Sequence, residues 1–149
     1  MQMPNYENKN LIFGLIFMLS NKLQTIGDSY FDTVTTKQWF VLTILRAMPD
    51  YEPTLNELSE AVGSSHQNVK QLILKLQQKG YIELNKDEAD ARRLRIKTTP
   101  KCDEFRSSYS KWSTTFTQKL YHDLDENDLE ITLKTMVKMK ENIDEMENN

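Results

Sequence analysis

The chain has 149 residues, 38% of them hydrophobic and 28% charged, and a net charge of −3. These values are typical of one folded domain, and the charge by itself argues weakly against nucleic-acid binding. A single cysteine excludes an intramolecular disulfide framework and fits a reducing compartment, so we expect a cytoplasmic protein.

The N-terminal part of the sequence predicts a lead-in followed by a long helix. Residues 1–9 are polar and contain a proline, which indicates a frayed segment. The apolar run over residues 11–19 is shorter than the about 20 residues that span a bilayer, and no signal-peptide cleavage pattern follows it. Secretion is therefore the less favoured alternative. Apolar residues then continue to Tyr30 on more than one side, as expected of a helix over residues 10–31 that also contacts a partner.

A second helix is expected to begin after Thr35 or Thr36 and to close at Pro49, because a proline cannot continue the hydrogen-bond ladder. Its apolar residues include Trp39. This side chain either belongs to the core or lines a small pocket beside the first helix, and the sequence leaves both interpretations open.

Residues 54–63 predict a short third helix. Thr54 and Glu57 have the T-x-x-E spacing of a capping box, in which each side chain binds the backbone N–H of the other residue. Leu55, Leu58 and the residues that follow at helical spacing mark one apolar side. Gly63 then suits the left-handed residue that ends a helix.

The next helix, over residues 64–80, has an unusual polar side. Ser64 and Gln67 predict a second capping box, and a buried stripe is expected at Val69, Leu72, Ile73 and Leu76. The opposite side carries amides, a hydroxyl and a cation, and no carboxylate occurs from Ser64 to Gly80. Gln, Asn and Lys are side chains that read base edges and phosphates. The alternative is a polar helix that only faces water.

Two short strands are expected next, over residues 81–84 and 94–98, with a charged loop between them. The order helix, turn, helix, hairpin is that of a winged helix. Arginines at the tip of such a ribbon suit a narrow groove with concentrated negative potential, although an ordinary solvated hairpin is an alternative. We therefore predict a mainly α fold, an α+β winged helix-turn-helix with about six helices and a two- to three-stranded wing.

Charge is distributed unevenly along the chain. Residues 64–100 contain eight cations and four acids, a balance of +4, whereas residues 122–149 contain nine acids and three lysines, a balance of −6. This asymmetry indicates one surface for a polyanion and another that is kept away from it.

The C-terminal part predicts two further helices. Thr99 suits a cap and Pro100 the first helical position, and aromatic residues recur from Phe105 to Phe116 in a stripe that is most simply core, packed on the first helix. Asp125 suits the cap of the final helix. The terminal helices are more apolar than one small winged helix requires, and a homodimer is the natural use for them.

The sequence resembles the MarR family of transcription regulators. The resemblance is carried by residues 90–101, Asp-Ala-Arg-Arg-Leu-Arg-Ile-Lys-Thr-Thr-Pro-Lys, and by residues 35–42, Thr-Thr-Lys-Gln-Trp-Phe-Val-Leu, and it extends over about residues 10–145. Cys102 and Thr98 depart from the usual Gly and Leu. The resemblance implies one MarR-like domain over residues 1–149, with a DNA-binding core at 35–99 and dimerisation helices at 10–31 and 100–147.

Under this interpretation the protein is a homodimeric regulator, expected to be a repressor, that binds a pseudo-palindromic operator in double-stranded DNA. Gln67 and Asn68 suit contacts to adenine, Lys70 and Lys75 suit phosphates, and Arg92 or Arg93 enters the minor groove. Asp90 either holds the Arg92 guanidinium and shapes the wing or is a surface acid without this role. The full set of expected DNA-binding residues is Ser64, Ser65, His66, Gln67, Asn68, Lys70, Gln71, Lys75, Arg92, Arg93 and Arg95.

The resemblance further implies a small aromatic effector, with Tyr30, Trp39 and Trp112 as candidate lining residues. Cys102 is either a redox switch, since a thiolate is favoured in the first turn of a helix, or an inert small residue. No metal site from Cys102, His66 and His122 and no cofactor is expected.

Two other classes of function remain as alternatives. A winged helix that binds protein without sequence-specific DNA binding is favoured by the net acidity of the chain. An enzyme is the weakest alternative, because the sequence has no Gly-rich phosphate loop, no H-x-x-x-H pair and no nucleophile elbow.

Overall fold

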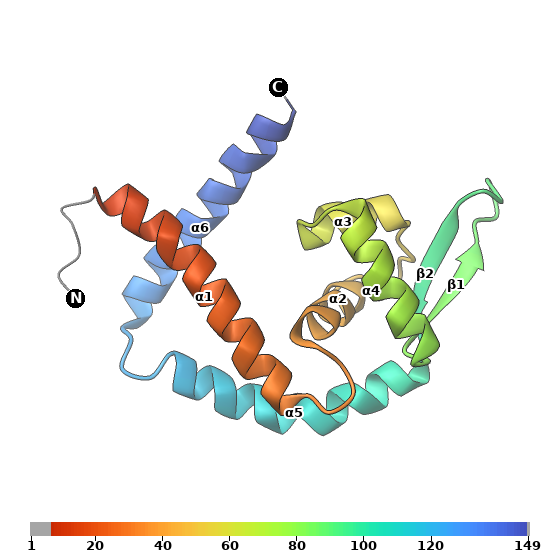
Figure 1. Ribbon diagram of the computed structural model, residues 1–149, viewed down its shortest axis with the longest axis horizontal. Coiled ribbons are helices and arrows are strands. Elements are labelled where there is room, and N and C mark those ends of the chain that lie inside the picture. Colours follow the sequence, from red (N-terminus) through yellow and green to blue (C-terminus); the bar gives the residue numbers. More distant parts are fainter. Residues whose placement is uncertain (1–6, 149) are drawn as a thin grey trace. The chain divides into compact units, whose positions relative to one another are not determined.

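The computed structural model describes residues 7–148, which form six helices and one two-stranded antiparallel sheet (Figure 1). This confirms the predicted fold class. In the predicted lead-in, residues 1–6 lie outside the described residues, while Asn8 and Lys9 already belong to the first helix. The elements are α1 Asn8–Tyr30, α2 Thr36–Arg46, α3 Leu55–Val62, α4 His66–Gln78, β1 Ile82–Lys86, β2 Leu94–Thr98, α5 Pro100–Leu120 and α6 Glu126–Glu147.

The chain divides into two compact units inside α5, one ending at Phe105 and the other beginning at Arg106. The expected organisation as a single domain stays a prediction, and so does the packing of the distal part of α5 on α1. None of the helices within residues 7–148 has the length and apolar character needed to cross a membrane.

The core of the first unit lies where α2, α3 and α4 pack against one another and against the sheet. The three helices and the ribbon lie together in Figure 1, with β1 beside α4. The predicted stripe of α4 is confirmed: Val69, Ile73 and Leu76 are buried and Leu72 is half-buried. Other buried apolar residues of this core are Val41, Leu42, Leu45, Leu58, Tyr81, Ile82 and Ile96.

The sheet is the wing of a winged helix. Leu84 pairs with Ile96 in an antiparallel register, and the backbone N–H of Ile96 also donates to the carbonyl of Pro53 at 3.0 Å. A single bridge between Thr54 and Arg95 is the only trace of a third strand among the described residues. Figure 1 shows the two strands standing beside α4, with the loop of residues 87–93 at their far end.

Local capping explains where the helices begin. Thr35 caps α2 in a capping box with Gln38, and Thr54 caps α3 in the predicted box with Glu57. Gly63 ends α3 at φ 67°, in the predicted left-handed conformation. Asp125 caps α6 as predicted.

The predicted capping box at Ser64 and Gln67 is wrong. The backbone N–H of Ser64 donates to the carbonyl of Ser59 at 3.2 Å, so this residue completes the left-handed closure of α3. Ser65 is the N-cap of α4 instead, and its hydroxyl accepts the N–H of Asn68 at 3.3 Å. The helix therefore begins at His66.

Two other boundaries differ from the predicted ones. Helix α2 ends at Arg46, before Pro49, and Ala47 is its C-cap. The first strand begins at Ile82, because the N–H of Tyr81 donates to the carbonyl of Leu76 and closes the turn after α4. Gly80 adopts φ 76° in that turn, a conformation that only glycine takes at no steric cost.

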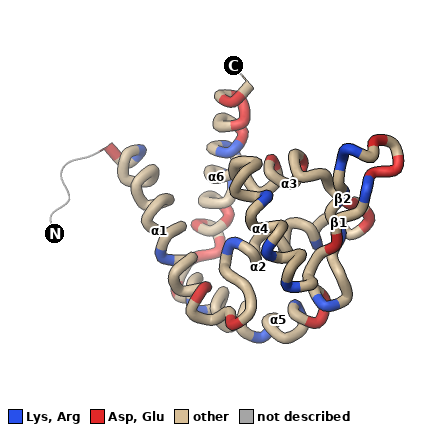
Figure 2. Tube along the Cα trace, turned by 45° about the vertical axis from the view of Figure 1, so that its right-hand side comes forward, with Lys and Arg blue, Asp and Glu red and all other residues tan. Residues whose placement is uncertain are grey.

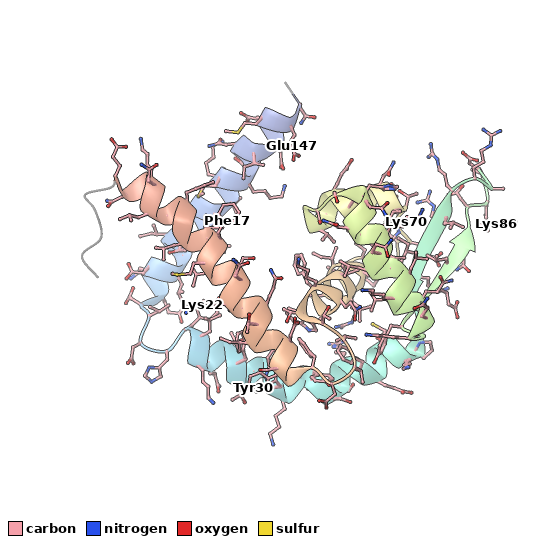
Figure 3. The ribbon with its side chains drawn as sticks, in the orientation of Figure 1. Phe17, Lys22, Tyr30, Lys70, Lys86 and Glu147 are labelled. Atoms are coloured by element: carbon pink, nitrogen blue, oxygen red, sulfur yellow. The ribbon has the colours of Figure 1, made fainter. Side chains whose placement is uncertain are left out.

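The terminal helices leave large apolar side chains in contact with solvent. Phe13 and Phe17 of α1 are exposed and contact each other edge to face, with ring centroids 5.1 Å apart. Figure 3 shows Phe17 on α1. In α6 no residue is buried, and the exposed side chains include Ile131, Leu133, Met136 and Val137.

Candidate nucleic-acid interface

The first part of the candidate site is the outward face of α4, the side opposite its buried stripe. Three turns carry Gln67, Lys70, Gln71, Leu74, Lys75 and Gln78 there, and all six side chains are exposed. Figure 3 shows Lys70 projecting from this helix. In the first turn, Ser65, His66 and Asn68 are exposed as well, whereas Ser64 is half-buried in the turn that precedes the helix.

The outward face carries positive charge without acids. In Figure 2, α4 has lysine positions and no aspartate or glutamate position. The first turn contains no acidic side chain, so the positive end of the helix dipole adds to the charge of Lys70. The face is therefore suited to an anion. Leu74, 38% exposed in the middle of this face, is a feature that reasoning from the sequence missed.

The second part is the tip of the wing, where Asp90 organises the loop. Its carboxylate accepts the backbone N–H of Arg92 at 3.0 Å and lies 3.6 Å from Nε of Arg93. The expected contact of Asp90 with the Arg92 guanidinium is thus replaced by one with the Arg92 backbone and one with the Arg93 side chain. Arg93 remains 66% exposed. Both arginine side chains are therefore accessible from outside the wing.

Arg95 lies near the loop end of the wing, where it pairs with Asn85, and its side chain points back toward the helices. Its Nε donates to the Asp87 carboxylate, and its Nη1 donates to the carbonyl of Glu52 at 3.1 Å and lies 3.5 Å from the carboxylate of Glu57. The hydrogen bond from Arg95 lowers the pKa of Asp87, and the same hydrogen bond raises the pKa of Arg95. The guanidinium thus joins the wing loop to the start of α3.

Lys79 is also used within the fold, although the sequence counts it among the cations of this region. Its ammonium group donates to the carbonyl of Thr33 at 2.7 Å and to Oε1 of Gln38 at 2.9 Å. Gln38 is buried, so this contact satisfies a polar group that the core encloses. The sequence signal that could have revealed Gln38 is its T-x-x-Q spacing from Thr35. The positive charge available to a ligand is therefore smaller than the number of cations in residues 64–100 suggests.

The three candidate effector residues do not share one unit. Trp39 is half-buried and stacks on Phe31, with ring centroids 6.0 Å apart. The ring centroid of Phe31 lies in turn 6.2 Å from that of Phe105. This favours the core interpretation of Trp39. Tyr30 is exposed at the end of α1, and Trp112 stacks on Phe116 within the second unit. A lining formed by Tyr30, Trp39 and Trp112 together stays a prediction.

Cys102 lies in the first turn of α5, as predicted, and is 1% exposed. Burial raises the pKa of its thiol. Loss of hydration therefore disfavours a thiolate here, and it outweighs the nearby positive charge of Arg46, which lowers the pKa. This leaves the inert-residue interpretation as the better supported one. Across residues 7–148, no three His, Cys, Asp or Glu side chains form a group that could hold a metal ion.

Comparison with known proteins finds one matching family model and several similar solved structures. Residues 32–93 match the model of the MarR family. The structure of a MarR/EmrR family transcriptional regulator from Acinetobacter sp. ADP1 is 20% identical, covers 94% of this chain and 99% of its own, and has a TM-score of 0.81. The structure of a complex of S. aureus MepR with DNA is 25% identical, covers 87% of this chain and 95% of its own, and has a TM-score of 0.75.

A third structure concerns regulation of DNA binding of Bordetella bronchiseptica BpsR by 6-hydroxynicotinic acid. It is 18% identical, covers 92% of this chain and 98% of its own, and has a TM-score of 0.77. No curated protein matches the chain. The match to the family model includes α2, α3, α4 and β1 and ends before β2, whereas the three solved structures cover 87–94% of the chain. The chain therefore shares the fold of solved MarR-family transcriptional regulators, and its residues 32–93 match the model of that family.

Proposed function

We propose that this protein is a repressor that binds a pseudo-palindromic operator in double-stranded DNA as a homodimer. The single observation that carries the proposal is the outward face of α4, which is exposed, free of acids and rich in amides, beside a wing with exposed arginines. The neighbour MepR, which at 25% identity shares this winged-helix fold, has been solved in complex with DNA. That likeness supports the same class of ligand here.

In this proposal the first turns of α4 enter the major groove. Gln67, Asn68 and Gln71 present amides, each of which offers a donor and an acceptor and can bind the N6 and N7 positions of adenine together. Ser65 caps the helix through its oxygen, which leaves its hydroxyl hydrogen free to donate. His66 stands at the first helical position, and Ser64 reaches the DNA only at the edge of the contact, since it is half-buried.

The cations would fix the protein on the sugar-phosphate backbone. Lys70 and Lys75 lie on either side of the outward face and would meet phosphates of the two strands, contacts that set register but carry no sequence information. Arg92 or Arg93 would enter the adjacent minor groove, where negative potential is concentrated. We assign Arg95 a positioning role in place of direct contact, because its Nε and Nη1 groups are engaged with Asp87, Glu52 and Glu57.

The terminal helices support the proposed homodimer. Phe13 and Phe17 of α1, together with Leu133 and Met136 of α6, are exposed apolar side chains that cost free energy in water. A second copy of the chain could cover them. A two-fold symmetric pair would present two α4 helices to two half-sites about one turn of DNA apart, which is why we propose a pseudo-palindromic operator.

We further propose that a small aromatic ligand regulates DNA binding. The neighbour BpsR, whose DNA binding is regulated by 6-hydroxynicotinic acid, supports this class of effector. Such a ligand acts only through a difference in its affinity for the DNA-competent and other arrangements of the protein. Tyr30, Trp39 and Trp112 remain the residues to test as its contacts, and a cytoplasmic location stays a prediction.

Selection of bound duplexes from a random pool tests the proposal. Expected are two enriched half-sites in inverted orientation, spaced about 10 base pairs apart. Mobility shifts at two salt concentrations should give a steep fall of affinity with salt, because neutralised phosphates release counterions. A protein that enriches no sequence and binds duplex weakly at both salt concentrations would favour the alternative, a winged helix that binds protein, for which the acidic charge of residues 122–149 is the supporting feature.

A further inference from the structure

Leu74 is the one apolar side chain on the outward face of α4, within the part of the chain that the structure describes. It follows Gln71 by three residues and precedes Gln78 by four, so at about 100° per residue it lies in one row with these amides. The buried residues Val69 and Leu76 lie on the opposite side. The exposed fraction of Leu74 is 38%, so part of this residue is accessible to a ligand.

We propose that Leu74 is a specificity-determining residue that contacts the C5-methyl group of a thymine in the major groove. The inference rests on the proposed function and deepens it. Thymine alone among the four bases presents a methyl group on this edge, and an apolar side chain is its natural partner. Against guanine or cytosine, the same leucine would cover hydrogen-bonding groups without satisfying them, which disfavours these bases.

The position of Leu74 also sets where its thymine lies. Leu74 stands seven residues after Gln67, two turns and about 10 Å further along the helix axis. Successive base pairs are about 3.4 Å apart, so this separation allows the two side chains to contact different base pairs of the same half-site. The expected half-site therefore contains an adenine near Gln67 and, at another position, a thymine that contacts Leu74.

The test uses duplexes that the full-length wild-type protein enriches from a random pool. Each thymine of one half-site is replaced in turn by deoxyuridine, which removes only the methyl group. Wild-type affinity should fall about fourfold at one position, as expected for one methyl-sized apolar group that loses its contact. For Leu74→Ala, the same replacement should leave affinity unchanged, whereas Leu74→Met should keep the sensitivity, since its side chain is also apolar.

Two controls separate this contact from loss of structure. The midpoint of thermal unfolding of Leu74→Ala should stay close to that of the wild type, because Leu74 lies outside the core. Deoxyuridine outside the half-sites should affect none of the proteins. The inference fails if wild-type protein tolerates deoxyuridine at every position, or if Leu74→Ala keeps the wild-type penalty. If the pool yields no enriched sequence, the proposed function itself fails, and this inference with it.

Discussion

The hydroxyl of Tyr51 donates a 2.6 Å hydrogen bond to the carboxylate of Glu57, the residue that completes the capping box of α3. The same carboxylate accepts the backbone N–H of Thr54 at 2.7 Å and lies 3.5 Å from the Arg95 guanidinium. One side chain therefore joins the loop before α3, the cap of α3 and the wing. The orientation of the wing relative to α3 and α4 depends on this junction.

The junction predicts acid sensitivity. Hydrogen bonds from Tyr51 and Thr54, with a smaller contribution from Arg95, lower the pKa of Glu57 from 4.5 to about 2. Because the folded pKa lies below the unfolded value, the stabilisation is fully present above pH 4.5 and is lost as the pH falls toward 2. Glu57→Gln, which can keep the capping box, should lower the free energy of unfolding at pH 7 by on the order of 1 kcal/mol, reduced by solvent screening.

Urea unfolding of both proteins at several pH values measures this effect. The difference between wild type and Glu57→Gln should shrink between about pH 5 and pH 2. A difference that stays constant over this range would show that the charge of Glu57 contributes nothing to stability.

Substitutions of Arg93 and Arg95 are expected to change the salt dependence of DNA binding by different amounts. The Arg93 side chain is 66% exposed and lies 3.6 Å from Asp90, so Arg93→Ala should weaken DNA binding and lower the slope of log affinity against log salt by about one unit. Affinities measured by fluorescence anisotropy over a series of salt concentrations give this slope. Unchanged affinity at every salt concentration would exclude Arg93 from the interface.

Arg95→Ala should also weaken DNA binding, but with a smaller change in the salt slope. The charge of Arg95 is already compensated by Asp87 and Glu57, so its removal displaces the wing and does not remove a phosphate contact. Faster amide hydrogen exchange in residues 87–95 should accompany the loss. A fall in slope as large as that of Arg93→Ala would instead indicate that Arg95 meets a phosphate directly.

Two glycines of α1 form a matched pair for a stability test. A Cβ atom at Gly27 would lie 2.2 Å from Oγ1 of Thr36, a hydroxyl held by hydrogen bonds to Gln24 and Asp28, whereas a Cβ at Gly14 meets nothing within 4 Å. Gly27→Ala should lower the free energy of unfolding by about 1–3 kcal/mol through overpacking. Gly14→Ala should be neutral or raise it by up to about 1 kcal/mol, because alanine favours helix.

Thermal or urea unfolding of the two variants decides this point. Equal losses at both positions would contradict the close approach of α1 to the start of α2. The comparison is informative because both substitutions make the same chemical change in the same helix.

Cys102 should be unreactive in the native protein. The thiol is buried and its pKa is raised, so a thiol reagent at pH 7 should modify it slowly until denaturant exposes the side chain. Treatment with peroxide should leave the DNA affinity of the wild type equal to that of Cys102→Ala. Rapid native-state modification, or a loss of affinity that Cys102→Ala prevents, would restore the redox-switch hypothesis.

Features that depend on residues close together in sequence could be predicted well. The T-x-x-E spacing of Thr54 and Glu57 gave the start of α3, Gly63 gave its end, and the apolar spacing of α4 gave its buried side. Each of these involves a contact over at most seven residues. The error at Ser64 and Ser65 is also local: two adjacent serines both suit a cap, and the hydrogen bond from Ser64 to Ser59 decides between them.

The sequence by itself determined the succession of helices and strands, the acid-free side of α4 and the arginines of the wing, because periodicity and capping act along the chain. Only the tertiary structure decided which charges remain available. Lys79 reaches Gln38 and Thr33 across more than forty residues, and Arg95 reaches Glu57 across 38. Such contacts depend on how distant segments pack together, and no local pattern encodes that packing.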